Sequence, residues 1–433
     1  MNVKRVLLSL WLLIAAFAAH AQTLTHGPVV GGVTDTQATI FVRTGVPAKV
    51  TIRYSTDLGL LMYSESRTIA TTTSQDNTAT VPISGLKGGT KYYLDVAVDG
   101  VAQLRRPYPS FTTFAPAGAA RGFKFVVLTD FATVNSLQRS SFTWQSAAAE
   151  QPDFVFIGGD FDHRNPKTLG AKRVMFKDLY NPSTPNMDGF VTFILRQFPI
   201  AHQWDDHDSG LNNLDTTYPD WNLTQQAFHE YTPSYPLPKI SPAGIWQKFS
   251  YAQVDFFVLD CRSQRTPETA RDDSKKTMLG AVQLQWLENG LLASTATWKI
   301  IFTSVVTNPT TKYPDGWAGY QTEWRALRDF IRGNKISNVV FIAGDLHLGA
   351  IDNGAASGFP EMCVPQANGA EDGLHCPTSA YGIWSEGYST SDCSGYSIVT
   401  VRQDPDRLLL ETADEFGSRT ISYSLPSANS VFR

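Results

Sequence analysis

The stretch FPIAHQWDDHD, residues 198–208, joins an apolar, strand-like run to an acidic motif that contains a histidine. The same order, an apolar run followed closely by aspartate, recurs in FKFVVLTD at 123–130, FVFIGGD at 154–160 and VVFIAGDLH at 339–347. Buried parallel strands read as continuous apolar runs, and their carboxyl ends meet at one edge of the sheet. The sequence therefore predicts an α/β sheet whose edge gathers several carboxylates and histidines.

Aspartate and histidine at strand ends form a suitable ligand set for two neighbouring cations. Such cations can share a bridging carboxylate, lower the pKa of a bound water and hold a phosphate oxygen. A single aspartate after a strand is more often a turn residue or a helix cap. Because four strand-like runs in one chain are each followed by an aspartate, the pattern favours a metal-dependent hydrolase.

The composition is typical of a packed globular protein. The chain has 433 residues, a formal net charge of −4, and 42% hydrophobic residues. This length allows two domains. No run of Lys and Arg is long enough to follow a nucleic-acid backbone, so we expect no nucleic-acid partner. The composition indicates chemistry on a small molecule.

The N-terminus has the layout of a secretory signal peptide, which we predict over residues 1–21. Lys4 and Arg5 precede an apolar run at 6–19, and AHA at 19–21 has the small-x-small pattern of a cleavage site. A membrane anchor is the alternative, but the run is short for a bilayer span. No later segment is long and apolar enough to span a bilayer. We therefore expect an exported protein, periplasmic or extracellular, without stable membrane insertion.

Export also bears on the four cysteines, because an oxidising compartment permits disulfides. Cys363, Cys376 and Cys393 lie in one loop-rich stretch, and we expect at least one disulfide among them, with the pairing open. Cys261 follows a strand-like run at 256–260 and is expected to be a small buried thiol.

A change of periodicity along the chain predicts two domains. Residues 22–116 alternate polar and apolar residues in short runs separated by turns, which is typical of a small antiparallel β-sandwich. A small-residue stretch at 115–122 suits a linker. In residues 117–433, strand-like runs alternate with helix-like segments, which indicates an α/β layer structure. These helix-like segments are 136–150, 281–293 and 319–332.

Two long segments follow acidic motifs. Residues 209–238 are polar, aromatic and proline-rich, and we expect a loop that forms a wall of the active site. Its aromatic side chains could line a pocket for a nucleobase or a lipid headgroup, or could pack within the loop. Residues 352–393 could form a lid stiffened by a disulfide, or a surface insertion without a role.

The chain also resembles a known family over nearly its whole mature length. The acidic motif with Asn212 and Asn213 behind it is the most specific landmark. Further landmarks are GPVVGGVTD at 27–35, GLKGGTKYY at 85–93, LDCR at 259–262, QWL at 285–287 and GDLH at 344–347. Together they resemble the alkaline phosphatase D (PhoD-like) branch of the calcineurin-like metallophosphoesterases. The resemblance implies a four-layer metallophosphoesterase α/β sandwich preceded by a small fibronectin-like β-sandwich.

The resemblance also implies a metal-binding role for each acidic motif. Asp130 takes the first-strand metal position, and Asp160 becomes the carboxylate that bridges both metals. Asp206 stands where the wider superfamily has an asparagine and is expected to bind the second metal. Asp345 and His347 take the two final metal positions, one toward each metal.

The identity of the metals stays open because of His163. Three residues after the bridging aspartate the family usually has a tyrosine that binds ferric iron, and this chain has His163. The resemblance implies two or more metal ions, calcium and iron, whereas imidazole also suits zinc, and manganese is a further alternative. Calcium suits the more carboxylate-rich second site, near Asp206 and Asp345.

Residues beside the metals are assigned to catalysis. By resemblance, His207 donates a proton to the leaving group. Asp208 or, equally well, Asp205 would orient its imidazole. Both aspartates could instead be turn residues.

Three further residues are candidates for substrate binding. Asn212 and Asn213 can donate amide hydrogen bonds to phosphate oxygens, or one of them can order the loop. Arg262 can clamp a phosphate through its planar fork, or serve as a structural ion-pair partner.

These assignments predict a secreted phosphoesterase that hydrolyses phosphate monoesters or diesters with a metal-bound hydroxide at a binuclear site. Its partner is a small phosphate-ester substrate, and the oligomeric state is open. One alternative is a phospholipase D-like phosphodiesterase that acts on lipid headgroups. The other is a non-catalytic secreted protein that binds a phosphorylated ligand without turnover.

Overall fold

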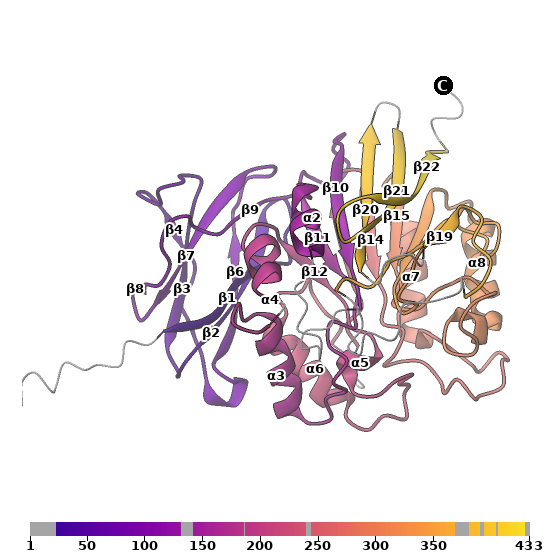
Figure 1. Ribbon diagram of the computed structural model, residues 1–433, viewed down its shortest axis with the longest axis horizontal. Coiled ribbons are helices and arrows are strands. Elements are labelled where there is room, and N and C mark those ends of the chain that lie inside the picture. The colour runs from indigo at the N-terminus through magenta and orange to yellow at the C-terminus, as the bar shows by residue number, and fades with distance from the viewer. Residues whose placement is uncertain are drawn as a thin grey trace, which may run out of the picture.

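Figure 1 shows the computed structural model, in which β-sheets lie between groups of helices. The structure describes residues 23–130, 142–185, 187–239, 244–368, 381–389, 394–403 and 406–428. The predicted signal peptide at 1–21 lies outside the described residues, as do Cys376 and Cys393. Within the described ranges, none of the helices combines the length and the hydrophobicity that a bilayer span requires.

The larger sheet has nine strands. In order across the sheet they are β22 (Arg419–Pro426), β21 (Asp406–Asp414), β20 (Gly395–Gln403), β10 (Phe123–Leu128), β11 (Phe154–Ile157), β12 (Ile200–His202), β1 (Leu24–Gly31), β2 (Gln37–Thr44) and β6 (Thr78–Ser84). The central strands β10, β11 and β12 pair in parallel, as the apolar runs predicted. Their carboxyl ends therefore lie at the same edge of the sheet.

The second sheet has seven strands. In order they are β13 (Gln247–Tyr251), β14 (Val254–Val258), β15 (Trp298–Phe302), β16 (Val339–Ala343), β18 (Glu361–Cys363), β17 (Gly349–Asp352) and β19 (Gly387–Ser389). Strands β14, β15, β16 and β18 are parallel, so this sheet also presents a shared carboxyl edge.

Aromatic side chains fill the layer between the two sheets. The rings of Phe156 and Phe302 stack with centroids 3.5 Å apart, and Phe154 meets Phe256 edge to face at 5.5 Å. Each such pair contributes roughly 0.5–1.5 kcal/mol beyond the area that it buries. This packing holds the carboxyl ends of the two sheets in a fixed relation.

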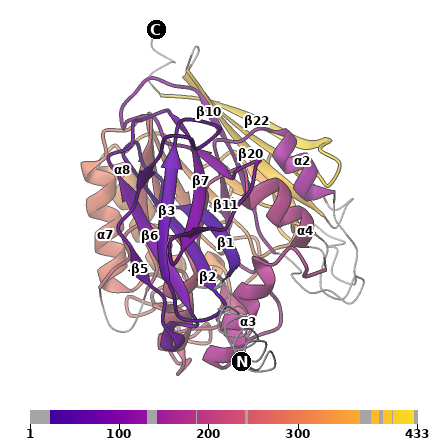
Figure 2. The ribbon, with the colours of Figure 1, turned by 90° about the vertical axis from the view of Figure 1, so that its left-hand side faces the viewer.

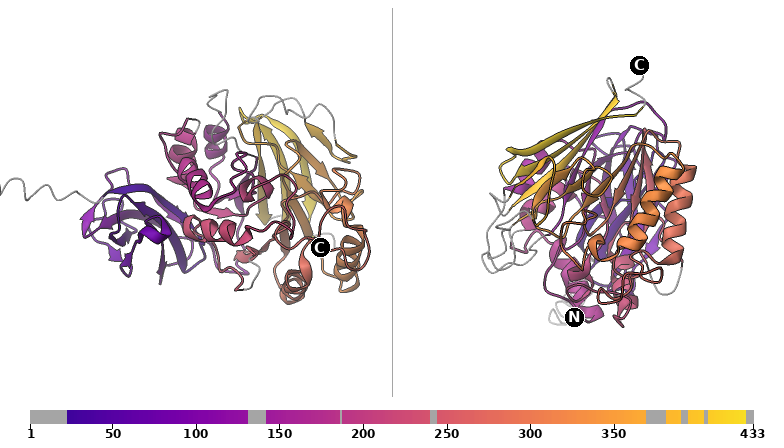
Figure 3. Two further views of the ribbon diagram at one scale, coloured as in Figure 1. Left: turned by 90° about the horizontal axis from the view of Figure 1, so that it is seen from below. Right: turned by 90° about the vertical axis from the view of Figure 1, so that its right-hand side faces the viewer.

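Helices cover the outer faces of both sheets (Figure 3). The helices are α2 (Thr143–Ala149), α3 (Leu169–Leu179), α4 (Met187–Gly189), α5 (Asp206–Ser209), α6 (Trp221–Tyr231), α7 (Gly280–Ala293) and α8 (Gln321–Gly333). Short turns of other helix types are η1 (Thr73–Gln75), η2 (Phe190–Leu195) and η3 (Trp317–Gly319). Helices α2, α3 and α6 pack on the nine-stranded sheet, and α7 and α8 pack on the seven-stranded sheet. The predicted four-layer α/β sandwich is confirmed.

The N-terminal β-sandwich is present, but it shares a sheet with the rest of the chain (Figure 2). Its outer sheet contains β4 (Ser64–Glu65), β3 (Lys49–Ser55), β7 (Lys91–Val98) and β8 (Val101–Ala102), with β5 (Ile69–Ala70) on β3 and β9 (Ser110–Thr112) on β7. The other face is β1, β2 and β6, which continue the nine-stranded sheet through the pairing of Gly31 with Ile200. A Cβ at Gly31 would lie 2.3 Å from the carbonyl oxygen of Pro233, so glycine is required at this junction.

Residues 209–238 are not a continuous loop, because they contain α6. Its buried face includes Trp221, Phe228 and Tyr231. The ring of Tyr231 stacks on Phe176 of α3 at 5.3 Å. Within the segment, Tyr218 meets Trp221 edge to face at 5.6 Å, so the contacts support a packing role for these aromatic residues.

The described cysteines are both free and buried. Cys261 lies 3.2 Å from the hydroxyl of Thr303, which confirms the expected buried thiol. Cys363 lies inside β18, is fully enclosed and takes part in no disulfide, so the expected disulfide, whose pairing was open, does not use this residue. Pairing of Cys376 with Cys393 stays a prediction, because both lie outside the described residues.

Candidate metal centre

Four turns at the carboxyl ends of β10, β11, β12 and β16 supply the acidic motifs of the candidate centre. Asp130, Asp160, Asp345 and His347 have positive φ angles of 53°, 51°, 71° and 58°. A left-handed backbone costs a residue other than glycine roughly 1–2 kcal/mol, and such strain gathers at functional sites. Asp206 instead lies in the first turn of α5, where the helix dipole favours a carboxylate.

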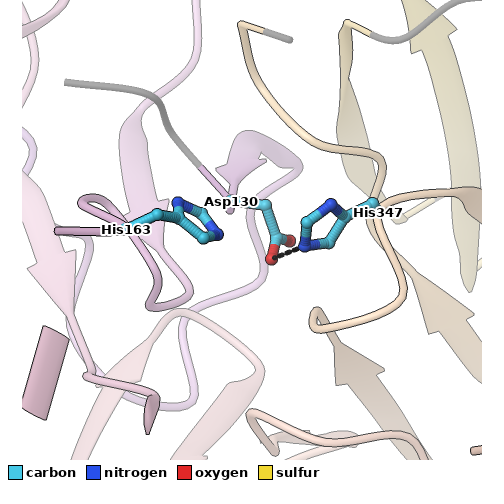
Figure 4. Close-up of side chains that lie close together, drawn as sticks. All are labelled: Asp130, His163 and His347. Carbon is cyan, nitrogen blue, oxygen red and sulfur yellow. Dashed lines mark ion pairs between the residues drawn. The ribbon is translucent and has the colours of Figure 1, made fainter. Parts of the chain in front are cut away.

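The first cluster joins residues from three of these turns and is drawn in Figure 4. Ligand atoms of Asp130, His163 and His347 lie within 4.8 Å of one another. His347 Nε2 is 3.3 Å from Asp130 Oδ1. Two imidazoles and a buried carboxylate on three separate segments thus point toward one position.

Asp160 belongs to two further clusters. Its ligand atom lies within 4.8 Å of those of His163 and His207, and also within 4.8 Å of those of Asp205 and Asp206. Its Oδ1 accepts a hydrogen bond from the backbone N–H of His207 at 3.0 Å. The carboxylate of Asp160 thus lies between two groups of candidate ligands.

A fourth cluster contains only carboxylates. Ligand atoms of Asp206, Asp315 and Asp345 lie within 4.8 Å of one another, and all three side chains are buried. The backbone N–H of Asn213 donates to Asp206 Oδ2 at 2.6 Å and fixes that carboxylate. Asp315 was not among the residues predicted from the sequence.

Arg262 lies behind these carboxylates and is 0% exposed. Its Nε and Nη2 donate to the two carboxylate oxygens of Asp205. Its Nη1 donates to Asp315 at 2.7 Å, and Nη2 donates to Asp345 at 3.1 Å and lies 3.3 Å from Asp206. Of the two sequence interpretations, this geometry favours the structural ion-pair partner.

Comparison with known families places the chain. The sequence model of the PhoD-like phosphatases matches residues 138–366, more than half of the chain. The chain belongs to the PhoD-like phosphatase family. This confirms the resemblance inferred from the acidic motif and its neighbours. A second model, described as a domain of unknown function (DUF7800), matches residues 21–115.

Individual proteins similar to this PhoD-like chain are consistent with its family and fold. Alkaline phosphatase D of Bacillus subtilis is 25% identical over 330 residues, which are 65% of this chain and 53% of the relative. The chain thus spans about half the length of that curated relative. A solved PhoD structure superposes with a TM-score of 0.75 at 19% identity, over 92% of this chain and 89% of that chain. The structure of a purple acid phosphatase from yellow lupin seeds superposes with a TM-score of 0.64 at 12% identity, over 94% of this chain and 75% of that chain. These two structures support the metallophosphoesterase fold.

The imidazole of His207 is held by a residue that the sequence analysis missed. His207 Nδ1 lies 2.7 Å from the amide oxygen of Asn165. Asp208 instead accepts hydrogen bonds from the backbone N–H groups of Asp160, Phe161 and Asp205 at 2.7, 2.9 and 3.0 Å. The carboxylate of Asp208 therefore fixes the loop around the centre, and its proposed contact with the imidazole is not favoured.

The two asparagines after the acidic motif occupy different environments. The side-chain amide of Asn213 donates to Glu268 at 3.1 Å, while its backbone holds Asp206. Asn212 is exposed. The geometry favours a loop-ordering role for Asn213 and leaves Asn212 accessible to a substrate.

Burial and charge separate the carboxylates of this PhoD-like centre into two groups. Burial raises the pKa of Asp130 to about 8 and that of Asp205 to about 7. Burial also disfavours ionisation of Asp206 and Asp315, but Arg262 together with Lys312 and other nearby cations outweighs it, so the pKa of Asp206 is lowered and that of Asp315 falls to about 2. The raised pKa of Asp130 favours binding of a further cation at that carboxylate, whereas the nearby cations already neutralise part of the charge at Asp206 and Asp315.

The donor set fits bound metal ions. Asp130 Oδ1 and Asp345 Oδ2 are buried and accept no hydrogen bond within the part of the chain that the structure describes. An unsatisfied buried carboxylate oxygen is costly unless a cation reaches it. The nearby imidazoles of His163, His207 and His347 add nitrogen ligands of the kind that transition metals prefer.

Chelator-treated protein is expected to lose stability as the pH rises. The pKa of Asp130 lies at about 8 in the folded protein, above the ordinary value of 3.8. Between these values the folded protein keeps a proton that the unfolded chain has released, so rising pH favours unfolding. The contribution is complete below the ordinary value and is lost as the pH passes through about 8. Urea unfolding at about pH 5 and about pH 8 measures the slope.

Two further measurements test this explanation. Added zinc or manganese should reverse the trend, because metal binding replaces the proton. Asp130→Asn removes one of the titrating groups and should make the slope shallower, with the rest due to other buried carboxylates such as Asp160 and Asp205. An Asp130→Asn slope equal to that of the unaltered protein would contradict the assignment.

Asn165 and Asp315 escaped sequence analysis, as did Lys312, whose Nζ donates to Asp345 Oδ1 at 2.5 Å. All lie in irregular segments, where no periodicity marks them. Asp315 lies in the sequence YPDGW, which reads as an ordinary turn. We found no signal in the single sequence that separates these residues from other loop residues.

Proposed function

We propose that this chain is a metal-dependent phosphoesterase that hydrolyses phosphate monoesters or diesters at a binuclear site. The position of Asp160 carries the proposal, since it is shared by the cluster with His163 and His207 and the cluster with Asp205 and Asp206. A carboxylate between two groups of ligands is what two neighbouring cations require. Membership of the PhoD-like phosphatase family supports the same reaction class.

The ligands divide between two positions in this proposal. The first position takes Asp130, Asp160, His163 and His347, and the second takes Asp160, Asp206 and Asp345. The imidazoles of the first position suit iron or zinc, and the carboxylates of the second suit calcium or manganese. When bound, the two cations would lower the pKa of a water and neutralise charge on the phosphate.

His207 is the proposed proton donor to the leaving group. Its Nδ1 is held by the amide oxygen of Asn165 at 2.7 Å. If Nδ1 carries its proton toward that oxygen, Nε2 is the atom that can take up a second proton and, from the imidazolium form, deliver it to the departing ester oxygen. Asn212, exposed beside the centre, is the proposed hydrogen-bond donor to the substrate.

Asn165→Ala is expected to lower kcat by about 10-fold or more with little change in KM, because it frees the His207 ring without removing a substrate contact. Asn165→Asp keeps the acceptor oxygen and should retain more activity. Asn181→Ala is the matched control, since Asn181 caps a turn at Ser183 and contacts no candidate ligand in the described hydrogen bonds. A rise in KM alone would show that Asn165 acts on substrate binding instead.

We further propose that residues 1–21 direct export and that residues 22–116 and 117–433 form the N-terminal and catalytic domains. The match of separate family models to 21–115 and 138–366 supports this division. Mass determination of the secreted protein would locate the first residue of the mature chain.

The decisive experiment is hydrolysis of a nitrophenyl phosphate monoester, a bis-nitrophenyl diester and phospholipid vesicles. The mature protein would be stripped with chelator and supplied separately with calcium, iron, zinc or manganese. Metal-dependent turnover of either ester would support the proposal, and the preferred metal would show the effect of His163. Turnover confined to phospholipids would favour the phospholipase D-like alternative. Folded, metal-loaded protein that hydrolyses none of these would favour a binding protein.

A further inference from the structure

Lys312 reaches the carboxylate cluster from the segment between β15 and η3. Its Nζ donates to Asp345 Oδ1 at 2.5 Å and to the backbone carbonyl of Asp345 at 3.2 Å. It also lies 3.5 Å from Asp315 Oδ2. An ammonium has three N–H donors, and the described hydrogen bonds of Lys312 use two of them.

Lys312 differs from the arginines of the cluster in its access to solvent. These arginines are Arg262 and Arg265, whose Nη2 lies 2.8 Å from Asp315 Oδ1. The side chain of Lys312 is 31% exposed, whereas both arginines are 0% exposed. The side chain of His347 is likewise partly exposed, at 22%. Among the described cations paired with these carboxylates, Lys312 is therefore the one that an incoming anion can reach.

We propose that Lys312 binds a terminal oxygen of the substrate's phosphoryl group and so favours phosphate monoesters over diesters. The inference rests on the proposed phosphoesterase function. Lysine binds phosphate as a compact point charge, and its third donor is available for that contact. Arg262, the phosphate clamp considered from the sequence, is enclosed and already bound to carboxylates.

Selectivity follows from the charge of the two ester classes. A monoester carries close to two negative charges above its second pKa of about 6 and has three terminal oxygens. A diester carries one charge and has two terminal oxygens, and its second ester group takes the place of the third. A cation beyond the metal ligands therefore adds more to the binding of the monoester.

The test uses the metal-loaded protein and three variants. Lys312→Met removes the charge and keeps most of the length of the side chain, and Lys312→Arg keeps the charge. Lys275→Met is the control, since Lys275 is exposed on a separate turn. For each protein we would measure bound metal, the affinity for inorganic phosphate by calorimetry, and kcat/KM for the nitrophenyl monoester and diester.

Lys312→Met is expected to weaken phosphate binding by about 10- to 100-fold, the range of a charge-assisted hydrogen bond, with metal content unchanged. The ratio of monoester to diester kcat/KM should fall similarly, and Lys312→Arg should restore part of both. Unchanged phosphate affinity, or equal losses for the two esters, would overturn the proposal. So would loss of metal in Lys312→Met, because Lys312 would then act only by holding Asp345. If the unaltered protein cleaves neither ester, the phosphoesterase proposal fails, while a phosphate affinity that depends on Lys312 would still support its role as an anion ligand.

Discussion

Asp160→Asn is expected to lower kcat/KM for phosphate esters by on the order of 10³-fold, because an amide replaces the carboxylate shared between the two metal positions. Asp160 is the residue that the structure places in both a histidine-containing and a carboxylate cluster. Its replacement should therefore weaken the binding of both metals, whereas replacement of a ligand at a single position should weaken mainly the binding of the metal at that position. Turnover of both nitrophenyl esters and metal content by mass spectrometry measure the effect.

The same substitution should not unfold the protein. Burial and the neighbouring aspartates raise the pKa of Asp160 well above its ordinary value, so a neutral amide relieves charge repulsion in the metal-free chain. Asp178→Asn is the matched control, since Asp178 pairs with Arg164 at 2.7 Å and is 27% exposed. It should keep its metals and its activity. An Asp160→Asn variant that retained two metals and full turnover would exclude the bridging role.

The sequence could predict that the acidic motifs lie close together, because each motif follows a recognisable strand-like run. Apolar runs ending in aspartate are legible in the sequence, and parallel strands share a carboxyl edge. This reasoning brought Asp130, Asp160, Asp206 and Asp345 to one centre, where the structure places them. His163 joined them through the family resemblance rather than through periodicity.

The remaining features depend on tertiary packing that a single sequence does not show. The junction at Gly31 arises because β1 happens to lie beside β12, far along the chain. Asp315 and Lys312 come from a segment without regular structure, and only the folded chain brings them to Asp345. Helix α6 was missed because prolines and aromatic residues around it suggested a loop. Arg262 was singled out from the sequence, but only the folded structure shows that it is buried and paired with carboxylates such as Asp205.

Arg262→Met is expected to lower the free energy of unfolding of the metal-free protein by about 3–5 kcal/mol, the cost of removing one partner from a buried ion-pair network. The guanidinium contacts Asp205, Asp315 and Asp345 and is 0% exposed. Without it, these buried carboxylates must take up protons or repel one another. Urea unfolding in the presence of chelator measures the loss. Arg325→Met on the exposed face of α8 is the control and should change stability by less than about 0.5 kcal/mol.

Two further stability measurements distinguish the loss of charge pairing in Arg262→Met from the loss of packing. The double variant Arg262→Met, Asp205→Asn should lose roughly 1–3 kcal/mol less unfolding free energy than the sum of the losses in the two single variants. Each single change leaves a buried charged partner unpaired, whereas the double change removes both partners. Added metal should stabilise Arg262→Met more than the unaltered protein, since a cation can then neutralise the carboxylates that the arginine served. If neither arm recovers stability, the loss comes from a cavity rather than from charge. The buried arginine would then be a packing residue, and the carboxylate cluster would owe its ionised state to Lys312 and the bound metals.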